Sequence, residues 1–239
     1  MSASLWLFDF DNTLARLEPV VDWAASRREL EPMLRAAGAP EPLFERFPKG
    51  NLLLYDAYRA HLGGLVRRDG GEHSAILRQA SAIIEKYELL GVDRAEPLEG
   101  AISLLSSLCD GGRMVGIVTS NSSRTVKRWL EVNRASELVK LVVGRDSLLP
   151  LKPAPDTLVE ALKISAVKAS DASYVGDTVN DYHAASAAGV SFYGVAVSDS
   201  ARDALIRAGA AMVFASPSAL AIHLAPDFSS SAPTPRSET

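Results

Sequence analysis

The sequence predicts an α/β fold in which a parallel sheet forms the core and an all-helical block is inserted after the first strand. Three observations support this prediction. Leu5 to Phe8 are apolar without a break, as expected of a strand covered on both faces. After Pro97, short apolar runs alternate with segments of helical period, which is typical of βα units. Between these regions, residues 19–92 show helical period and no strand pattern.

Length, composition and charge limit the classes of function. The chain has 239 residues, enough for one large domain or for a core domain with a smaller insertion. Hydrophobic residues make up 47% and charged residues 23%, so a sizeable apolar core is available. The net charge is -4 and the lysines and arginines are scattered, which gives no electrostatic footprint for nucleic acid. We therefore expect a small molecule as partner.

Targeting signals and cysteine content indicate a cytoplasmic protein. No apolar run approaches the roughly 18 residues of a membrane helix, and no signal-peptide pattern precedes the first strand. Cys109 is the only cysteine, so no intrachain disulfide forms, and we interpret it as a half-buried helix residue rather than a nucleophile. Residues 226–239 are rich in serine and proline without apolar periodicity, which predicts a disordered tail.

The helical block has three segments in which apolar residues recur at spacings of three and four: 20–34, 41–62 and 72–90. Gly38 and Pro40 interrupt the pattern after the first segment. An all-helical block in this place predicts an inserted cap domain over residues 16–94, joined by flexible linkers near 15–17 and 91–93. The core domain then comprises residues 1–15 and 95–225.

The elements expected after Pro97 are, in order, helix 99–108, strand 114–118, a helix from Ser122 or Ser123, strand 141–143, helix 157–162, strand 172–175, helix 182–188, strand 192–195, helix 201–208, strand 212–214 and helix 218–224.

Two pairs of acids follow strands of the predicted sheet. Asp9 and Asp11 come directly after the first strand, at the edge where open α/β sheets bind their ligands. Because two carboxylates one residue apart repel each other, a hard cation such as Mg²⁺ would suit them. A turn or a helix N-cap accounts for them equally well. Asp177 and Asp181 form the second pair, after Gly176, which permits tight backbone geometry.

Polar residues also follow two other strands. Thr119, Ser120 and Asn121 end the second strand just before a helix, where a hydroxyl and free backbone N–H groups would seat a phosphate, although such residues also serve as ordinary caps. Lys152 lies in a loop with prolines at 150, 153 and 155, which restrict the backbone conformation of that loop. A merely solvated lysine is the alternative interpretation.

Together these segments closely resemble the four motifs of the haloacid dehalogenase-like hydrolase superfamily. The most specific are Asp-Phe-Asp-Asn-Thr-Leu at 9–14 and Gly-Asp-Thr-Val-Asn-Asp at 176–181, while Leu-Lys-Pro-Ala-Pro-Asp at 151–156 is typical of its phosphoglycolate phosphatase-like branch. The resemblance extends from residue 5 to about residue 215. It implies a Rossmann-like core with a helical cap between the first and second motifs.

The resemblance also implies a role for each motif residue. Asp9 is the implied nucleophile that forms an aspartyl-phosphate, and Asp11 the acid that protonates the leaving oxygen and then activates water. Mg²⁺ is held by Asp9, by the backbone carbonyl of Asp11 and by Asp177, while Asp181 orients metal-bound water or Lys152. The residues implied to bind the phosphoryl group are Thr119, Ser120, Asn121 and Lys152. The implied activity is Mg²⁺-dependent hydrolysis of a small phosphorylated metabolite by a monomer or homodimer.

Several alternatives stay open. A dehalogenase or a phosphonatase of this superfamily lacks the second acid of the first motif, so Asp11 argues against both. A phosphomutase keeps both acids, and a catalytically idle binding module on this fold would not require them. The first motif continues with Ala15-Arg16-Leu17 instead of the usual acidic and hydroxyl residues, which leaves the substrate open. Arg16 is a candidate to meet a substrate carboxylate, with a place on the linker as the favoured alternative. In the cap, Arg46, Lys49 and Asn51 are candidates to face the site, with ordinary surface positions as the default.

Overall fold

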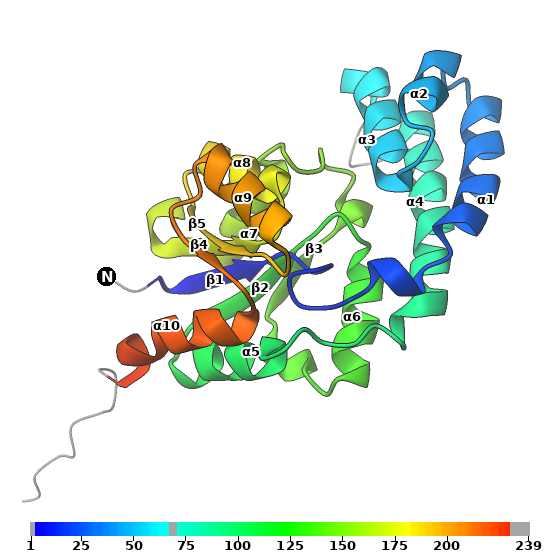
Figure 1. Cartoon of the computed structure of the whole chain (residues 1–239). Helices are drawn as coiled ribbons and strands as arrows, with labels where there is room; N and C mark the ends of the chain where they lie inside the picture. The colour runs from blue at the N-terminus through cyan, green and yellow to red at the C-terminus, as the bar shows by residue number, and fades with distance from the viewer. Residues whose placement is uncertain (1–2, 67–70, 230–239) are drawn as a thin grey trace, which may run out of the picture.

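The computed structural model describes residues 3–66 and 71–229, and at its centre lies a parallel sheet with strand order β3-β2-β1-β4-β5-β6 (Figure 1). The strands are β1 (Leu5–Phe8), β2 (Met114–Val118), β3 (Leu141–Val143), β4 (Ala172–Gly176), β5 (Ser191–Val195) and β6 (Val213–Phe214). Every pairing between them is parallel. The α/β prediction is confirmed, and the central position of β1 brings the ends of β2 and β4 next to Asp9.

The four residues of β1 are all buried because both faces of the sheet are covered. Trp6 and Phe8 point to the face that packs on α5, α6 and α10, while Leu5 and Leu7 pack toward α7 and α8. Figure 1 shows these helices on opposite sides of the sheet. The helices of the core are α5 (Ala101–Asp110), α6 (Ser123–Val132), α7 (Asp156–Ser165), α8 (Val179–Ala188), α9 (Asp199–Ala208) and α10 (Pro217–Ser229).

The inserted block between β1 and α5 is helical, and it lies beyond the carboxyl ends of the strands (Figure 1). It consists of α1 (Trp23–Ala36), α2 (Glu41–Arg46), α3 (Asn51–Leu62) and α4 (Glu72–Val92). The block has its own apolar cluster, which includes Leu30, Leu54 and Leu77. Leu148 and Leu151, from the loop that carries Lys152, belong to the same cluster. The cap therefore packs directly on a loop of the predicted site.

Three details differ from the expectations. The segment 41–62 is two helices, because the chain bends at Phe47–Gly50, where Gly50 has a φ of 89°. The linkers, expected to be flexible, are anchored in the core: Ala15, Leu17 and Val92 are fully buried in the apolar cluster on one face of the sheet. Helix α10 extends to Ser229, past the expected start of the tail, and residues 230–239 lie outside the described residues.

Short 3₁₀ turns complete the connections: Glu18–Val20, Gly63–Leu65, Ser136–Leu138, Arg145–Ser147 and Ala169–Asp171. Cys109 is half-buried on α5, as expected. In the part of the chain that the structure describes, no helix combines the length and the apolar character needed to cross a membrane.

Candidate active site

A cavity of about 260 Å³ lies at the carboxyl edge of the sheet, beneath the start of α3. Every side chain predicted to belong to the site lines it: Asp9, Asp11, Thr119, Ser120, Asn121, Lys152, Asp177 and Asp181. The parallel register explains why, since the ends of β1, β2 and β4 meet at one edge. We call this space the phosphoryl cavity.

Lys152 is the cationic centre of this cavity. Its Nζ donates hydrogen bonds to Asp9 Oδ1 at 2.6 Å, to Asp181 Oδ1 at 2.5 Å and to the hydroxyl of Tyr174 at 3.0 Å. Burial on its own would lower the pKa of Lys152, but the charges of Asp181 and Asp9 hold that pKa above its usual value. The Lys152 side chain, only 7% exposed, therefore stays protonated beside Asp9.

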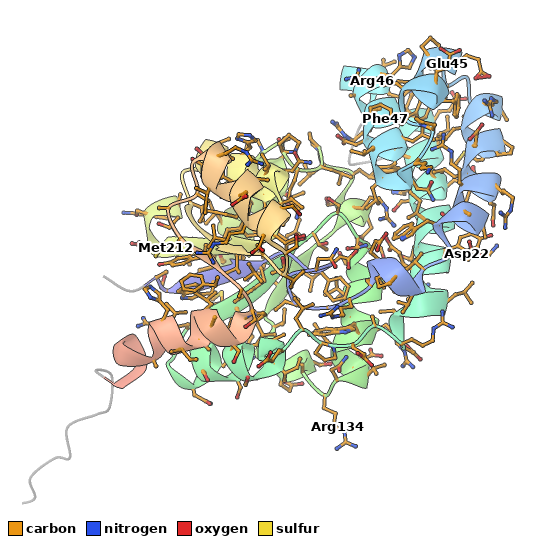
Figure 2. All side chains as sticks on the ribbon, viewed as in Figure 1. Asp22, Glu45, Arg46, Phe47, Arg134 and Met212 are labelled. Carbon is orange, nitrogen blue, oxygen red and sulfur yellow. The ribbon has the colours of Figure 1, made fainter. Side chains whose placement is uncertain are left out.

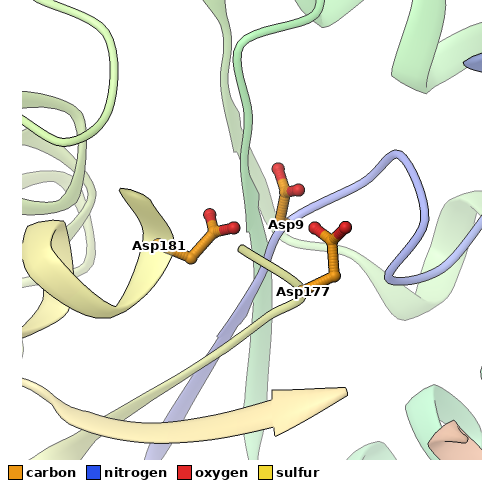
Figure 3. A group of neighbouring side chains, drawn as sticks. All are labelled: Asp9, Asp177 and Asp181. Atoms are coloured by element: carbon orange, nitrogen blue, oxygen red, sulfur yellow. The ribbon is translucent and has the colours of Figure 1, made fainter. Parts of the chain in front are cut away.

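Figure 3 shows the carboxylates of Asp9, Asp177 and Asp181 converging from the end of β1, the loop after β4 and the start of α8. One oxygen from each lies within 4.8 Å of the others. Burial raises the pKa of Asp9 to about 6, and burial together with the neighbouring charge of Asp9 raises the pKa of Asp177 to about 8. Crowded, desolvated carboxylates of this kind fit a hard divalent cation, which would favour their ionised forms.

Asp181 differs from the other two acids because both of its oxygens are occupied. Oδ1 accepts hydrogen bonds from Lys152 and Tyr174, and Oδ2 accepts from the backbone N–H and the hydroxyl of Thr178. Burial would raise the pKa of Asp181, but the charge of Lys152 and these donors hold it below its usual value. Asp9 and Asp177 are therefore the better-placed metal ligands, with Asp181 supporting Lys152.

Gly176 permits the close approach of α8 to β4. A Cβ atom at this position would lie 2.5 Å from Cβ and 2.6 Å from Cγ of Asp181. Since real Cβ atoms do not approach other carbons so closely, any side chain here would displace Asp181. The absence of a side chain at Gly176 thus leaves room for the Asp181 carboxylate beside Lys152.

Asp11 is hydrogen-bonded to the loop that follows it. Its Oδ1 accepts hydrogen bonds from the backbone N–H groups of Leu17 at 2.9 Å and Glu18 at 3.0 Å. Burial raises its pKa to about 6. Asp11 lines the phosphoryl cavity and also a second cavity of about 770 Å³ between the 11–18 loop and the cap. Its side chain therefore stands at the junction of the two cavities.

The expectation that the N-terminus of α6 offers free N–H groups is wrong for most of that turn. The N–H of Ser122 donates to Glu88, that of Ser123 to Asp146 and that of Thr125 to the Ser122 hydroxyl. Side chains thus cap this helix already. Among the described residues, the N–H and the hydroxyl of Ser120 have no such partner.

Thr119 and Asn121 also hydrogen-bond within the loop. The Thr119 hydroxyl donates to Asn121 Oδ1 at 3.1 Å, and the Asn121 amide donates to Glu88 at 3.0 Å. The Asn121 side chain, predicted to bind substrate, is therefore committed to holding the loop.

Glu88 and Arg145, two residues that the sequence did not reveal, form hydrogen bonds to this loop. Glu88 lies on α4 and Arg145 begins the 3₁₀ turn after β3. Arg145 Nη1 donates to Glu88 Oε1 and to the carbonyl of Ser120, both at 2.8 Å. No local motif marks either residue. The available signal was the charge of Glu88 at a buried position of α4. That signal can be used only when it is known which face of α4 is covered.

Asp56 is a third residue that the sequence did not reveal. It lies on α3, lines the phosphoryl cavity, and accepts hydrogen bonds from Arg59 at 2.9 Å and from the N–H of Leu151 at 3.1 Å. Leu151 directly precedes Lys152, so its bond to Asp56 joins α3 of the cap to the loop that carries Lys152.

Of the candidate residues in the cap and the linker, two line a cavity and two do not. Lys49 and Asn51 line the second cavity. Arg46 stacks on the Phe47 ring at 5.2 Å and Arg16 is exposed on the linker, and neither lines a described cavity. Figure 2 shows Arg46 at the end of the cap farthest from the sheet.

Comparison with known proteins gives consistent matches. The family model described as haloacid dehalogenase-like hydrolase matches residues 56–195. The chain is 30% identical over 192 residues to phosphoglycolate phosphatase 1 of Pseudomonas aeruginosa, a match that covers 78% of this chain and 66% of that protein. It is also 30% identical over 186 residues to phosphoglycolate phosphatase of Rhodospirillum rubrum, with 77% and 76% covered.

The fold has solved counterparts too. CbbY from Rhodobacter sphaeroides, crystallised in complex with phosphate, superposes with a TM-score of 0.62 at 22% identity, and the match covers 91% of this chain and 96% of that one. This similarity extends across both the sheet and the helical block.

Proposed function

Because this chain belongs to the haloacid dehalogenase-like hydrolases, as a phosphoric monoester hydrolase of their phosphoglycolate phosphatase-like branch, we propose that it hydrolyses a small phosphomonoester through an aspartyl-phosphate on Asp9, with Mg²⁺. The observation that carries the proposal is the buried contact between Lys152 and Asp9 in a cavity that Asp177 and Ser120 also line. As the sequence predicts, we propose a cytoplasmic monomer or homodimer.

Asp9 is the nucleophile. Lys152 favours the ionised form of the Asp9 carboxylate and fixes its direction through the 2.6 Å contact. Attack forms a bond between an Asp9 oxygen and phosphorus and breaks the bond between phosphorus and the leaving oxygen. Water then hydrolyses the aspartyl-phosphate and releases inorganic phosphate.

Asp11 donates a proton to the leaving oxygen. It stands where the phosphoryl cavity opens into the second cavity, so it faces the bond between phosphorus and the leaving group. Its pKa, raised by burial to about 6, makes its proton available near neutral pH. Once the alkoxide has taken that proton, the Asp11 carboxylate accepts a proton from the water that attacks the intermediate.

Charge on the phosphoryl oxygens is balanced by Lys152 and by the free N–H and hydroxyl of Ser120. Asp9, Asp177 and the backbone carbonyl of Asp11 would hold Mg²⁺, and the carboxylate cluster supports this assignment. When bound, the ion supplies positive charge that offsets repulsion between the carboxylates and the phosphoryl group. Asp181 keeps Lys152 in place.

The test is hydrolysis of p-nitrophenyl phosphate by the purified chain with Mg²⁺ and after complete chelation. We expect turnover that disappears on chelation and returns with added Mg²⁺. Asp177→Asn should weaken the response to Mg²⁺, whereas Asp203→Asn, a change at an exposed acid of α9, should not. Full activity after chelation would contradict the metal assignment, and absence of turnover with every phosphomonoester tried would contradict the function.

A further inference from the structure

The second cavity, which adjoins the phosphoryl cavity at Asp11, Leu52 and Leu53, has walls of two kinds. Apolar surface comes from Trp23, Ala24, Pro48, Leu52 and Leu53, and cationic surface from Arg27, Arg28 and Lys49. Resting on the proposed function, we infer that it holds the leaving group of the substrate, and that this group has an apolar body longer than a two-carbon acid and a carboxylate at its far end.

The size of the cavity supports the longer body. Its volume is about 770 Å³, within the range of cavities that enclose a whole small-molecule ligand. A two-carbon acid displaces on the order of 100 Å³, roughly the volume of a few water molecules. Such a small group would leave most of the apolar wall in contact with water.

The apolar wall is held in place before any ligand binds. The Trp23 ring nitrogen donates to the carbonyl of Glu18 at 3.0 Å, and the buried Asn51 amide donates to the carbonyl of Trp23, also at 3.0 Å. These bonds fix the start of α1 against the start of α3. A preformed wall favours a ligand of matching shape because little order has to be imposed on binding.

The cationic wall supports an acidic end. Arg28 and Lys49 have no ion-pair partner among the described residues. Arg27 lines the same wall and is anchored by Glu31 at 2.7 Å. Cations without a partner on the cavity wall favour a ligand that carries a negative charge.

The first turn of α3 adds to this preference for an anion. Gly50, Asn51, Leu52 and Leu53 all line the cavity, and no side chain caps the helix. The positive end of this twelve-residue helix therefore lies where the two cavities meet and favours a ligand with negative charge. The acids on the same wall are Asp11, at the phosphoryl end, and the exposed Glu18.

The experiment uses four alkyl phosphates with similar leaving alkoxides: ethyl phosphate, phosphoglycolate, hexyl phosphate and 6-(phosphonooxy)hexanoate. They vary the length of the body and the presence of a distal carboxylate independently. Affinity is measured by calorimetry with Mg²⁺ in the Asp9→Asn chain, which cannot form the intermediate, and hydrolysis is measured in the wild-type chain. Affinity thus tests the ligand class even where turnover fails.

We expect 6-(phosphonooxy)hexanoate to bind most tightly. Its affinity should exceed that of ethyl phosphate because of both its longer carbon chain and its distal carboxylate. In the Asp9→Asn background, Arg28→Gln and Lys49→Gln should each weaken it about 3- to 10-fold, as expected for partly exposed ion pairs, while hexyl phosphate and inorganic phosphate are unaffected. Arg46→Gln is the matched control, because it removes a cap cation that does not line the cavity.

Equal affinity for the four esters would overturn the inference. So would an equal loss of affinity for hexyl phosphate and for 6-(phosphonooxy)hexanoate in the Arg28 and Lys49 variants. Tight, variant-sensitive binding of the long acid without its hydrolysis by the wild-type chain would uphold the ligand class and contradict the proposed function instead.

Discussion

Glu88 and Arg145 form an ion pair of 2.8 Å in which neither side chain is exposed to solvent. The two oxygens of Glu88 also accept hydrogen bonds from Asn121, from the N–H of Ser122 and from Thr125. The pair therefore joins α4 of the cap to the loop that follows β2.

We predict that Glu88→Gln lowers the free energy of unfolding by about 3–5 kcal/mol, because it leaves the Arg145 guanidinium buried without its counter-charge. Urea unfolding of the full chain measures this loss. The control is Glu85→Gln, one turn earlier on α4, whose pair with Arg124 is partly exposed and should contribute less than about 1 kcal/mol. Similar losses for the two variants would show that burial does not set the strength of the Glu88 pair.

The same residue predicts a pH dependence of stability. Burial would raise the pKa of Glu88, but the charge and hydrogen bonds of Arg145, together with hydrogen bonds from Asn121 and the N–H of Ser122, hold it below its usual value of 4.5. A depressed pKa in the folded state means that the stabilisation is complete above pH 4.5 and is lost as the pH falls through the folded-state value. The difference in unfolding free energy between wild type and Glu88→Gln should therefore be constant from neutral pH to about pH 5.5 and shrink in stronger acid. A difference that grows on acidification would contradict this ionisation.

Asp11→Asn should separate binding from proton transfer. The amide keeps a carbonyl oxygen for the Leu17 and Glu18 N–H groups, so the loop retains its shape. Turnover of an alkyl phosphate should fall about 10²- to 10⁴-fold, since the alkoxide then leaves without a proton. With p-nitrophenyl phosphate, whose leaving group needs no proton, the loss should be much smaller. Equal losses for both esters would assign Asp11 a structural role instead.

Gly176→Ala should damage the site without unfolding the chain. The added Cβ would meet Asp181 at 2.5 Å and force it away from β4, so the contact between Asp181 and Lys152 would be lost. Overpacking of this size costs about 1–3 kcal/mol of stability, and a displacement near 1 Å costs about 10²-fold in rate. Stopped assays of phosphate release, together with thermal unfolding, measure both effects. A variant with wild-type kcat would show that the position of Asp181 does not matter.

Much of this site could be predicted from the sequence because its chemistry lies in short segments at strand ends. Asp9, Lys152 and Asp177 each stand in a local pattern, and a parallel sheet brings such ends to one edge whatever the rest of the chain does. The cap was visible as a helical block because its apolar residues keep a helical period over some seventy positions.

What escaped prediction depends on contacts between distant segments. Arg145 lies 57 residues from Glu88, and the two meet only because α4 packs on the core. The N–H groups of Ser122 and Ser123 were expected to be free, yet the acids that take them up lie 34 and 23 residues away. The bend before Gly50 had a local signal in Pro48 and Gly50, but apolar periodicity on both sides concealed it.

In the proposed mechanism, phosphate passes through a covalent bond to Asp9, and this bond can be trapped. The wild-type chain is mixed with Mg²⁺ and an ester carrying a radiolabelled phosphoryl group, quenched in acid within a single turnover, and digested. We predict label on the peptide that contains Asp9, released by hydroxylamine as expected of an acyl phosphate, and no label in Asp9→Asn. Phosphate release at the wild-type rate from Asp9→Asn, or label on any other residue, would contradict nucleophilic attack by Asp9.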